Sequence, residues 1–181
     1  GRRAALGFDL MDTVADQVYG GVDAWQVSSD GAIAATAGTV LTWQGRPIEA
    51  FFHSSSGGET DDGLAVWGLD LPYLRGIQDP DPSPNASWSF PLGRSAVRRA
   101  LGSLGADVGE PSGFEVTERT PHGRARWLRV TGPSGSVRVD ASKFRLLSGL
   151  RSTRFMVRGT EDGWVLDGGG WGHGLGMSQW G

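Results

Sequence analysis

Glycine takes every second position from 170 to 176, within the closing stretch GGGWGHGLGMSQWG that runs from 168 to 181. In an extended segment, residues two apart share a face, so these glycines would line one side. The other side would carry Trp171, His173, Leu175 and Met177. A glycine face lets another backbone or a ligand come close. The stretch therefore predicts either a binding edge or a core strand with a buried, hydrogen-bonded histidine.

The side chains between these glycines favour a sugar as the ligand of a binding edge. A tryptophan ring beside an imidazole suits a pyranose, because the ring packs on the C–H face of the sugar. A dinucleotide is a poor alternative, since the stretch contains no G-x-G-x-x-G register.

A second polar stretch, FFHSSSGGETDDG, occupies residues 51–63. Here a strand would bring His53 to its end, followed by three serines and two glycines. Consecutive small residues let backbone N–H groups face a shared concavity, which suits an anionic or hydroxyl-rich ligand. The alternative is a polar turn that caps the strand. A serine hydrolase using Ser54 to Ser56 is less favoured, because G-x-S-x-G is absent and no carboxylate–histidine pair can be assigned.

His53 and His173 are two of the three histidines, and they would share a cleft if the two stretches are neighbours. A zinc site would need at least one more ligand, which Glu59, Asp61 or Asp62 could supply. Their spacing has no metal signature, so we predict no metal and no cofactor. The third histidine, His122, falls in a turn and is expected to be exposed to solvent.

A length of 181 residues without an obvious seam indicates a single domain over residues 1–181, with an insertion expected at about 75–120. Because the sequence opens and stops abruptly, we expect it to be cut from a larger protein at both ends. The net charge of −3 and the single lysine favour neither nucleic acid nor an anionic membrane as partner. The absence of cysteine excludes disulfides and thiolate metal sites. No apolar run approaches the roughly 20 residues of a membrane span, and no signal peptide is visible.

Strand patterns dominate the chain and predict an α+β fold with mainly antiparallel sheet and a few short helices. Residues 32–53 read as three strands, with turns at 37–38 and 44–45 and the last strand ending near His53. The other expected strands are 115–120, 125–132 and 136–142, and a hairpin turns around 161–163.

Helical spacing is found over residues 94–104, where Ser95 or a neighbour would be the N-cap. Asp140 would cap a short helix that ends near Leu147. The stretch 9–19 is ambiguous, and the proline-rich stretch 78–88 reads as a surface loop.

Taken together, the two polar stretches resemble motifs of the SpoIID/LytB family of bacterial cell-wall proteins. Residues 53–60 match the family pattern H-S-x-S-G-G-x-T, and residues 168–181 match G-x-G-W-G-H-G-x-G-M-S-Q-W-G. Further family-like stretches are DLMDTVADQVYGG, YLRGIQDPD, LRVTGPSG and FRLLSGLRSTRF. The resemblance covers nearly the whole chain.

The resemblance implies an extracytoplasmic or secreted peptidoglycan lytic transglycosylase that cleaves between N-acetylmuramic acid (MurNAc) and N-acetylglucosamine (GlcNAc). One glutamic acid would protonate the leaving oxygen and then accept the proton of the muramic 6-hydroxyl, giving a 1,6-anhydro ring. The alternative is a non-catalytic, glycan-binding amidase enhancer. The implied partners are glycan strands and a cell-wall amidase; a membrane anchor would need an N-terminal segment that this chain lacks.

The family's catalytic glutamate precedes a helix reading roughly ALKAQAVAARTYA, which has no counterpart here. We therefore expect the general acid before residue 1 and assign the role to none of Glu49, Glu59, Glu110, Glu115, Glu118 and Glu161. Some members hold zinc through a cysteine near the first motif, where this chain has serines. The residues expected to bind glycan are His53, Ser54, Ser56, Gly57, Gly58, Thr60, Trp171, His173 and Gln179.

Overall fold

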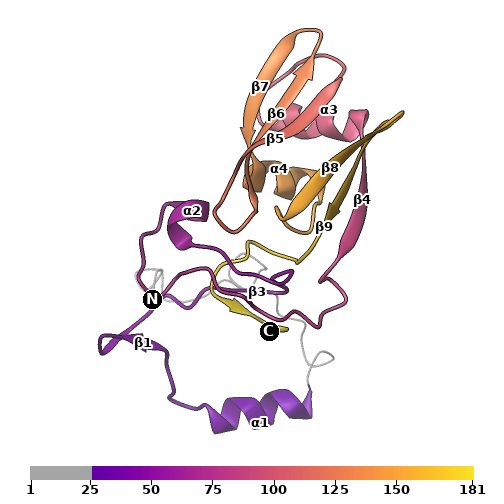
Figure 1. The fold of residues 1–181 in the computed structure, drawn as a ribbon. Helices are drawn as coiled ribbons and strands as arrows, with labels where there is room; N and C mark the ends of the chain where they lie inside the picture. The colour runs from indigo at the N-terminus through magenta and orange to yellow at the C-terminus, as the bar shows by residue number, and fades with distance from the viewer. Residues whose placement is uncertain (1–25) are drawn as a thin grey trace, which may run out of the picture. The chain divides into compact units, whose positions relative to one another are not determined.

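The computed structural model describes residues 26–181, which fall into two compact units (Figure 1). The first ends at Pro47 and the second spans Ile48–Gly181. Each is described by itself. The single domain expected from the sequence stays a prediction, and the ambiguous stretch 9–19 lies outside the described residues.

The first unit contains a helix, α1 (Val27–Ala35), and a hairpin of β1 (Thr42–Trp43) and β2 (Arg46–Pro47). The turn at 44–45 is confirmed, and both of its residues have positive φ, as a two-residue hairpin loop requires. The strand expected from residue 32 is wrong, because residues 32–35 are helical. Three of these four residues are alanine, the strongest helix former, and a run of small apolar residues carries no true alternation.

Two three-stranded antiparallel sheets form most of the second unit. One has the order β4-β9-β8 and the other the order β5-β6-β7 (Figure 1). The strands of the first sheet are β4 (Trp88–Gly93), β8 (Phe155–Thr160) and β9 (Gly163–Gly168). Those of the second are β5 (Gly113–Arg119), β6 (Ala125–Gly132) and β7 (Gly135–Asp140). The α+β class and these hairpins are confirmed.

Two helices cover the core between these sheets. The helix α3 (Arg94–Ser103) packs against β4 and α4, and α4 (Ala141–Ser148) packs against β6 and β7. Asp140 caps α4 as expected, since its carboxylate accepts the N–H of Lys143 at 2.9 Å. The cap of α3 is Gly93 and not Ser95. The most deeply buried apolar side chains include Leu92, Val97, Leu128, Val130, Phe144 and Leu166.

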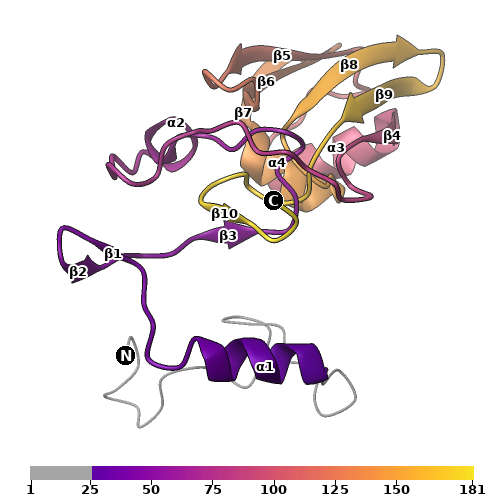
Figure 2. The same cartoon turned by 60° about the horizontal axis from the view of Figure 1, so that its bottom comes forward.

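The remaining elements bring distant parts of the chain together. The short strand β3 (Phe52–His53) pairs in parallel with β10 (Met177–Ser178), which joins the two stretches singled out in the sequence (Figure 2). The strand ending at His53 is thus confirmed, although it does not continue from β2, which belongs to another sheet. The short helix α2 (Gly63–Trp67) follows the first stretch. Within residues 26–181, no helix has the length and apolar character to cross a membrane.

Candidate functional site

The two polar stretches lie side by side, as the sequence suggested. Ser55 and Trp171 exchange both backbone hydrogen bonds, at 3.1 and 2.8 Å, and the N–H of Gln179 donates to the carbonyl of His53 at 3.0 Å. The ring centroids of His53 and His173 are 5.6 Å apart. The expected site residues that meet at one place, around the β3–β10 pair, are therefore His53, Ser54, Trp171, His173 and Gln179.

The closing stretch is not the extended strand that the alternation predicted. Gly170, Gly172, Gly174 and Gly176 all have positive φ, between 69° and 118°. A left-handed residue at every second position makes the chain change direction repeatedly, so the intervening side chains do not share one face. Trp171 is 47% exposed, whereas Leu175 is completely buried.

The space beside these glycines is occupied by other parts of the chain and is not open to solvent. A Cβ on Gly170 would lie 2.8 Å from the carbonyl oxygens of the Ser55–Ser56 segment, and one on Gly172 would lie 2.8 Å from the Cβ of His53. At Gly174 the Cβ would overlap the guanidinium of Arg124, and at Gly176 the carbonyl of Phe51. The close approach expected at the glycines is confirmed, and what approaches is chiefly the first polar stretch.

Leu175 sets the tautomers of both imidazoles. Its carbonyl lies 3.1 Å from Nδ1 of His53, and since a carbonyl only accepts, that nitrogen carries the proton. Its N–H donates to Nδ1 of His173 at 3.0 Å. Burial lowers the pKa of His53; burial and the neighbouring His53 lower the pKa of His173 to about 4. Both rings are therefore neutral at pH 7.

Aromatic rings surround the two histidines. Trp67 of α2 lies 4.6 Å from the ring of His173 and 5.2 Å from Phe51. The guanidinium of Arg151 lies 5.2 Å above the ring of Trp171. Trp67, like Trp171, is nearly half exposed, and such rings offer the flat apolar face on which a sugar stacks. Sequence reasoning missed both as site residues: Trp67 stands in no motif, and Arg151 lies in a family-like stretch, FRLLSGLRSTRF, to which no role was assigned.

The loop 54–58 holds an anion that belongs to the chain itself. Oδ2 of Asp81 accepts the hydroxyl of Ser55 at 2.5 Å and the N–H of Gly57 at 2.7 Å. Burial raises the pKa of Asp81, but these bonds and those from Ser83 outweigh it and keep the pKa below the ordinary value of 3.8. The concavity predicted for an anionic ligand is therefore filled by Asp81. The stretch 78–88 is thus more than a surface loop.

Three other expected ligand residues are used inside the protein. Ser56 is completely buried, and its hydroxyl accepts the N–H of Gly58 at 3.1 Å. Thr60 is 3% exposed, and it exchanges hydrogen bonds with the backbone of Ile77. These contacts give them a positioning role; direct contact with a ligand stays a prediction.

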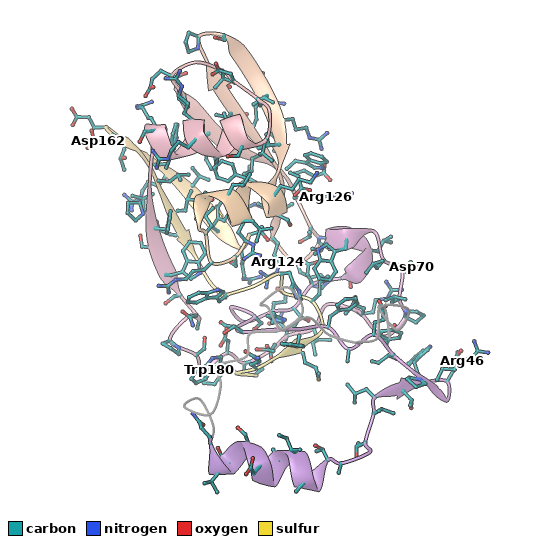
Figure 3. The ribbon with its side chains drawn as sticks, turned by 180° about the vertical axis from the view of Figure 1, so that it is seen from behind. Arg46, Asp70, Arg124, Arg126, Asp162 and Trp180 are labelled. Carbon is teal, nitrogen blue, oxygen red and sulfur yellow. The ribbon has the colours of Figure 1, made fainter. Side chains whose placement is uncertain are left out.

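A buried ion pair that the sequence did not reveal lies beneath this loop. Arg124 is 1% exposed, and its Nη2 donates to the carbonyls of Ser56 and Glu59 at 2.7 and 3.2 Å (Figure 3). Its Nε lies 3.9 Å from Oδ2 of Asp61, a fully buried carboxylate that also accepts the hydroxyl of Thr120. Burial lowers the pKa of Arg124 to about 10, so the side chain stays charged at neutral pH.

His122 is not the exposed residue that its turn suggested, because its side chain is only 21% exposed. Its Nδ1 lies 2.9 Å from Glu59 and its Nε2 lies 3.5 Å from Asp62. The bond with Glu59 raises the pKa of His122, and the same bond lowers the pKa of Glu59. Arg154 completes the cluster, 3.6 Å from Glu59.

The residues around His53 do not fit a zinc ion. Among the residues that the structure describes, no three His, Cys, Asp or Glu side chains are grouped as metal ligands. Asp61 is paired with Arg124, and Glu59 with His122. One nitrogen, Nε2 of His53, is buried without a partner, but one free imidazole nitrogen does not make a metal site.

Comparison with known proteins gives two kinds of match. A family described as a domain of unknown function (DUF8618) matches residues 88–176, which is 89 of the 181 residues. Stage II sporulation protein D of Bacillus amyloliquefaciens is 31% identical over 155 residues, covering 83% of this chain and 42% of that protein. Amidase enhancer of Bacillus subtilis is 26% identical, covering 97% of this chain and 32% of that protein.

An uncharacterized protein of Brachyspira hyodysenteriae is also similar, at 27% identity over 97% of this chain and 48% of that protein. The chain thus spans less than half the length of each of these relatives. They define a class of bacterial proteins related to sporulation protein D and to amidase enhancer. The resemblance to the SpoIID/LytB family is confirmed, because the chain is homologous to proteins named Stage II sporulation protein D and to one named Amidase enhancer.

Replacing Gly174 with alanine should destabilise the protein beyond the cost of its backbone conformation. Gly149 has nearly the same φ, 77° against 80°, but nothing lies within 4 Å of a Cβ placed there. We expect Gly149→Ala to cost about 1 kcal/mol of unfolding free energy through its left-handed backbone. Gly174→Ala should cost about 2 kcal/mol more, because the methyl group displaces Arg124. If urea unfolding shows the same loss of free energy for Gly149→Ala and Gly174→Ala, the close contact between Gly174 and Arg124 is contradicted.

The pair of His122 and Glu59 should stabilise the fold in a limited pH window. The raised pKa of His122 gives stability that is full below 6.5 and lost as the pH rises through the folded value. The lowered pKa of Glu59 gives stability present above 4.5 and lost at lower pH. Both contributions to stability are therefore present between about pH 4.5 and pH 6.5.

The replacement His122→Gln should therefore lower the free energy of unfolding more at about pH 5.5 than at about pH 8, by up to about 1 kcal/mol. Urea unfolding at both pH values measures the difference. The control is Glu115→Gln, which removes an exposed pair with Arg129 that contains no histidine. Its cost should be the same at both pH values. A His122→Gln cost that is equally independent of pH would contradict the assignment.

Proposed function

We propose that this chain binds the glycan strands of peptidoglycan and forms part of a lytic transglycosylase that cleaves between MurNAc and GlcNAc. The observation that carries the proposal is the β3–β10 pair. It sets His53 beside His173, with Trp171 and Trp67 nearly half exposed. The similarity to sporulation protein D supports the same conclusion.

The electrostatics of this site suit a neutral sugar. Both imidazoles are uncharged at pH 7, because burial lowers their pKa values. His53 is buried and Nδ1 of each ring is bonded to Leu175, so the neutral imidazoles shape the site without the attraction for anions that a cation would bring. The exposed indoles supply apolar faces for pyranose rings. Gln179 and Ser54, at the edge of the same pair, are available for sugar hydroxyls.

The proposed reaction needs one carboxyl group and consumes no water. The acid protonates the leaving oxygen as the bond from C1 of MurNAc breaks. The resulting carboxylate then takes the proton of the 6-hydroxyl, whose oxygen bonds to C1 and closes the 1,6-anhydro ring. A single residue serves both steps, because the nucleophile is part of the substrate.

Glu59, the glutamate of the first motif, does not suit this role. A general acid needs a raised pKa at neutral pH, as in a partly apolar site. The pKa of Glu59 is lowered instead by its bond with His122 and by Arg154. A glutamate before residue 1 as the acid stays a prediction.

The second candidate function is a non-catalytic, glycan-binding module that assists a cell-wall amidase. The similarity to a protein named Amidase enhancer, aligned with 97% of this chain, supports it. Both functions use the same binding surface and differ only in whether the glycan bond is cleaved. Either would place the protein outside the cytoplasm, where peptidoglycan lies.

Binding to purified glycan strands stripped of peptides tests the shared part of both functions. Trp171→Ala should weaken binding about tenfold, the effect of losing one stacked ring. Trp127→Ala is the control, because Trp127 lies on β6 under Arg138, outside this site. Equal affinities of the two variants, measured by isothermal titration, would exclude the proposed surface.

Digestion of the same strands by the full-length natural protein separates the two candidates. Products ending in 1,6-anhydro-MurNAc, identified by mass spectrometry, would establish the transglycosylase. Binding without such products, together with faster release of stem peptides by an added amidase, would establish the enhancer.

A further inference from the structure

A cavity of about 470 Å³ opens beside the candidate site, within the second unit. Its walls come from the β4-β9-β8 sheet, from Arg119 at the end of β5 and from Gly123 in the turn that joins β5 to β6. Gly57 of the first motif also lines it, so the cavity borders the loop that carries the candidate site. Its volume is in the range of small-ligand sites, roughly 300–1,000 Å³.

Arg119 brings a positive charge to this cavity that no carboxylate of the described residues meets. Its guanidinium donates to the carbonyl of Gly123 at 2.9 Å and to the sulfur of Met156 at 3.5 Å, both uncharged acceptors. The other arginines on the strands nearby, Arg126, Arg129, Arg138 and Arg158, each lie within 3.4 Å of a carboxylate. Arg119 therefore keeps unused donors suited to a planar oxyanion.

The charges at the cavity are arranged asymmetrically. Arg154 adds a second cation, although it is shared with Glu59 at 3.6 Å and with the carbonyl of His122 at 2.8 Å. Asp167 is the one carboxylate in the lining, and it accepts the hydroxyl of Ser89 at 2.7 Å. A ligand would thus direct a carboxylate towards Arg119 and could present an N–H or hydroxyl towards Asp167.

The remaining wall is apolar. The indole N–H of Trp88 is already donated to the carbonyl of Gly170 at 2.8 Å, so only its ring is left for other contacts. Phe155 and Met156 line the cavity beside it. At Gly123 a Cβ would meet nothing nearer than Arg154, at 4.0 Å, so the turn leaves this side of the cavity open. An apolar body with one carboxylate matches these walls.

We propose that this cavity binds a carboxylate-bearing group of peptidoglycan, with Arg119 as the residue that recognises the carboxylate. The identity of the polymer rests on the proposed function. Two groups on the same polymer have this chemistry: the lactyl ether of muramic acid and the stem peptide. Gly57 and Gly169, which lie in or next to the two motifs, line the cavity together with Arg119, so the cavity borders the segment that carries the exposed Trp171.

Titration calorimetry with three soluble probes tests this assignment. The first probe is a GlcNAc–MurNAc tetrasaccharide, the second the same sugar with its lactyl carboxylates reduced to alcohols, and the third a free stem pentapeptide. Arg119→Gln should weaken binding of the carboxylate-bearing probe about tenfold, the effect of losing a charged hydrogen bond. Arg129→Gln, an exposed arginine on β6, is the matched control. Thermal unfolding of each variant checks that it is folded.

The outcomes distinguish the two sources and the two proposals. Loss of affinity for the tetrasaccharide on lactyl reduction, absent in Arg119→Gln, assigns the lactyl group. Loss of affinity for the pentapeptide in Arg119→Gln but not in Arg129→Gln assigns the stem. If neither sugar binds but the peptide does so through Arg119, the proposed function fails and the cavity assignment stands. If Arg119→Gln binds both the tetrasaccharide and the pentapeptide as tightly as the unchanged protein does, the cavity assignment is overturned. The comparison of the two sugars uses the unchanged protein, so it shows whether the lactyl carboxylate contributes to binding even if Arg119→Gln does not fold.

Discussion

The buried ion pair of Arg124 and Asp61 holds the second unit together around the candidate site. Arg124 binds two carbonyls of the first motif and lies against Gly174 of the closing stretch. Asp61 accepts the hydroxyl of Thr120, which lies between β5 and β6. Both side chains are almost completely buried, so removing either would leave a charge without a partner in the interior. The arrangement of the two motifs therefore depends on the Arg124–Asp61 pair, which includes neither His53 nor His173.

Once this pair fixes the two stretches, the rest of the site follows from backbone geometry. Four left-handed glycines let the closing stretch lie directly on the first motif. Leu175 then orients both imidazoles through its N–H and carbonyl, and burial keeps the rings neutral. The residues left at the surface are largely aromatic, which is the chemistry expected for a glycan.

The loop 54–58 separates two surfaces of different charge. Asp81 accepts the N–H of Gly57 and the hydroxyl of Ser55, so the loop is a wall of the site and not an open anion site. On one side lie the neutral histidines and Trp171; on the other lies the cavity with Arg119. A polymer that alternates neutral and carboxylate-bearing sugars would match both surfaces at once.

The sequence by itself determined the α+β class, the long hairpins, the capping of α4 by Asp140 and the proximity of the two motifs. The first three features depend on local patterns of turns and alternation. The proximity of the two motifs was expected from their resemblance to motifs of one family. It misjudged residues 32–35, where small apolar residues imitate a strand, and it treated the glycine alternation as an extended face. Only the tertiary structure revealed the Arg124–Asp61 pair, the filling of the loop by Asp81, the partial burial of His122 and the role of Trp67. Each of these depends on side chains that lie far apart in sequence, and no local pattern records which of them fold against one another.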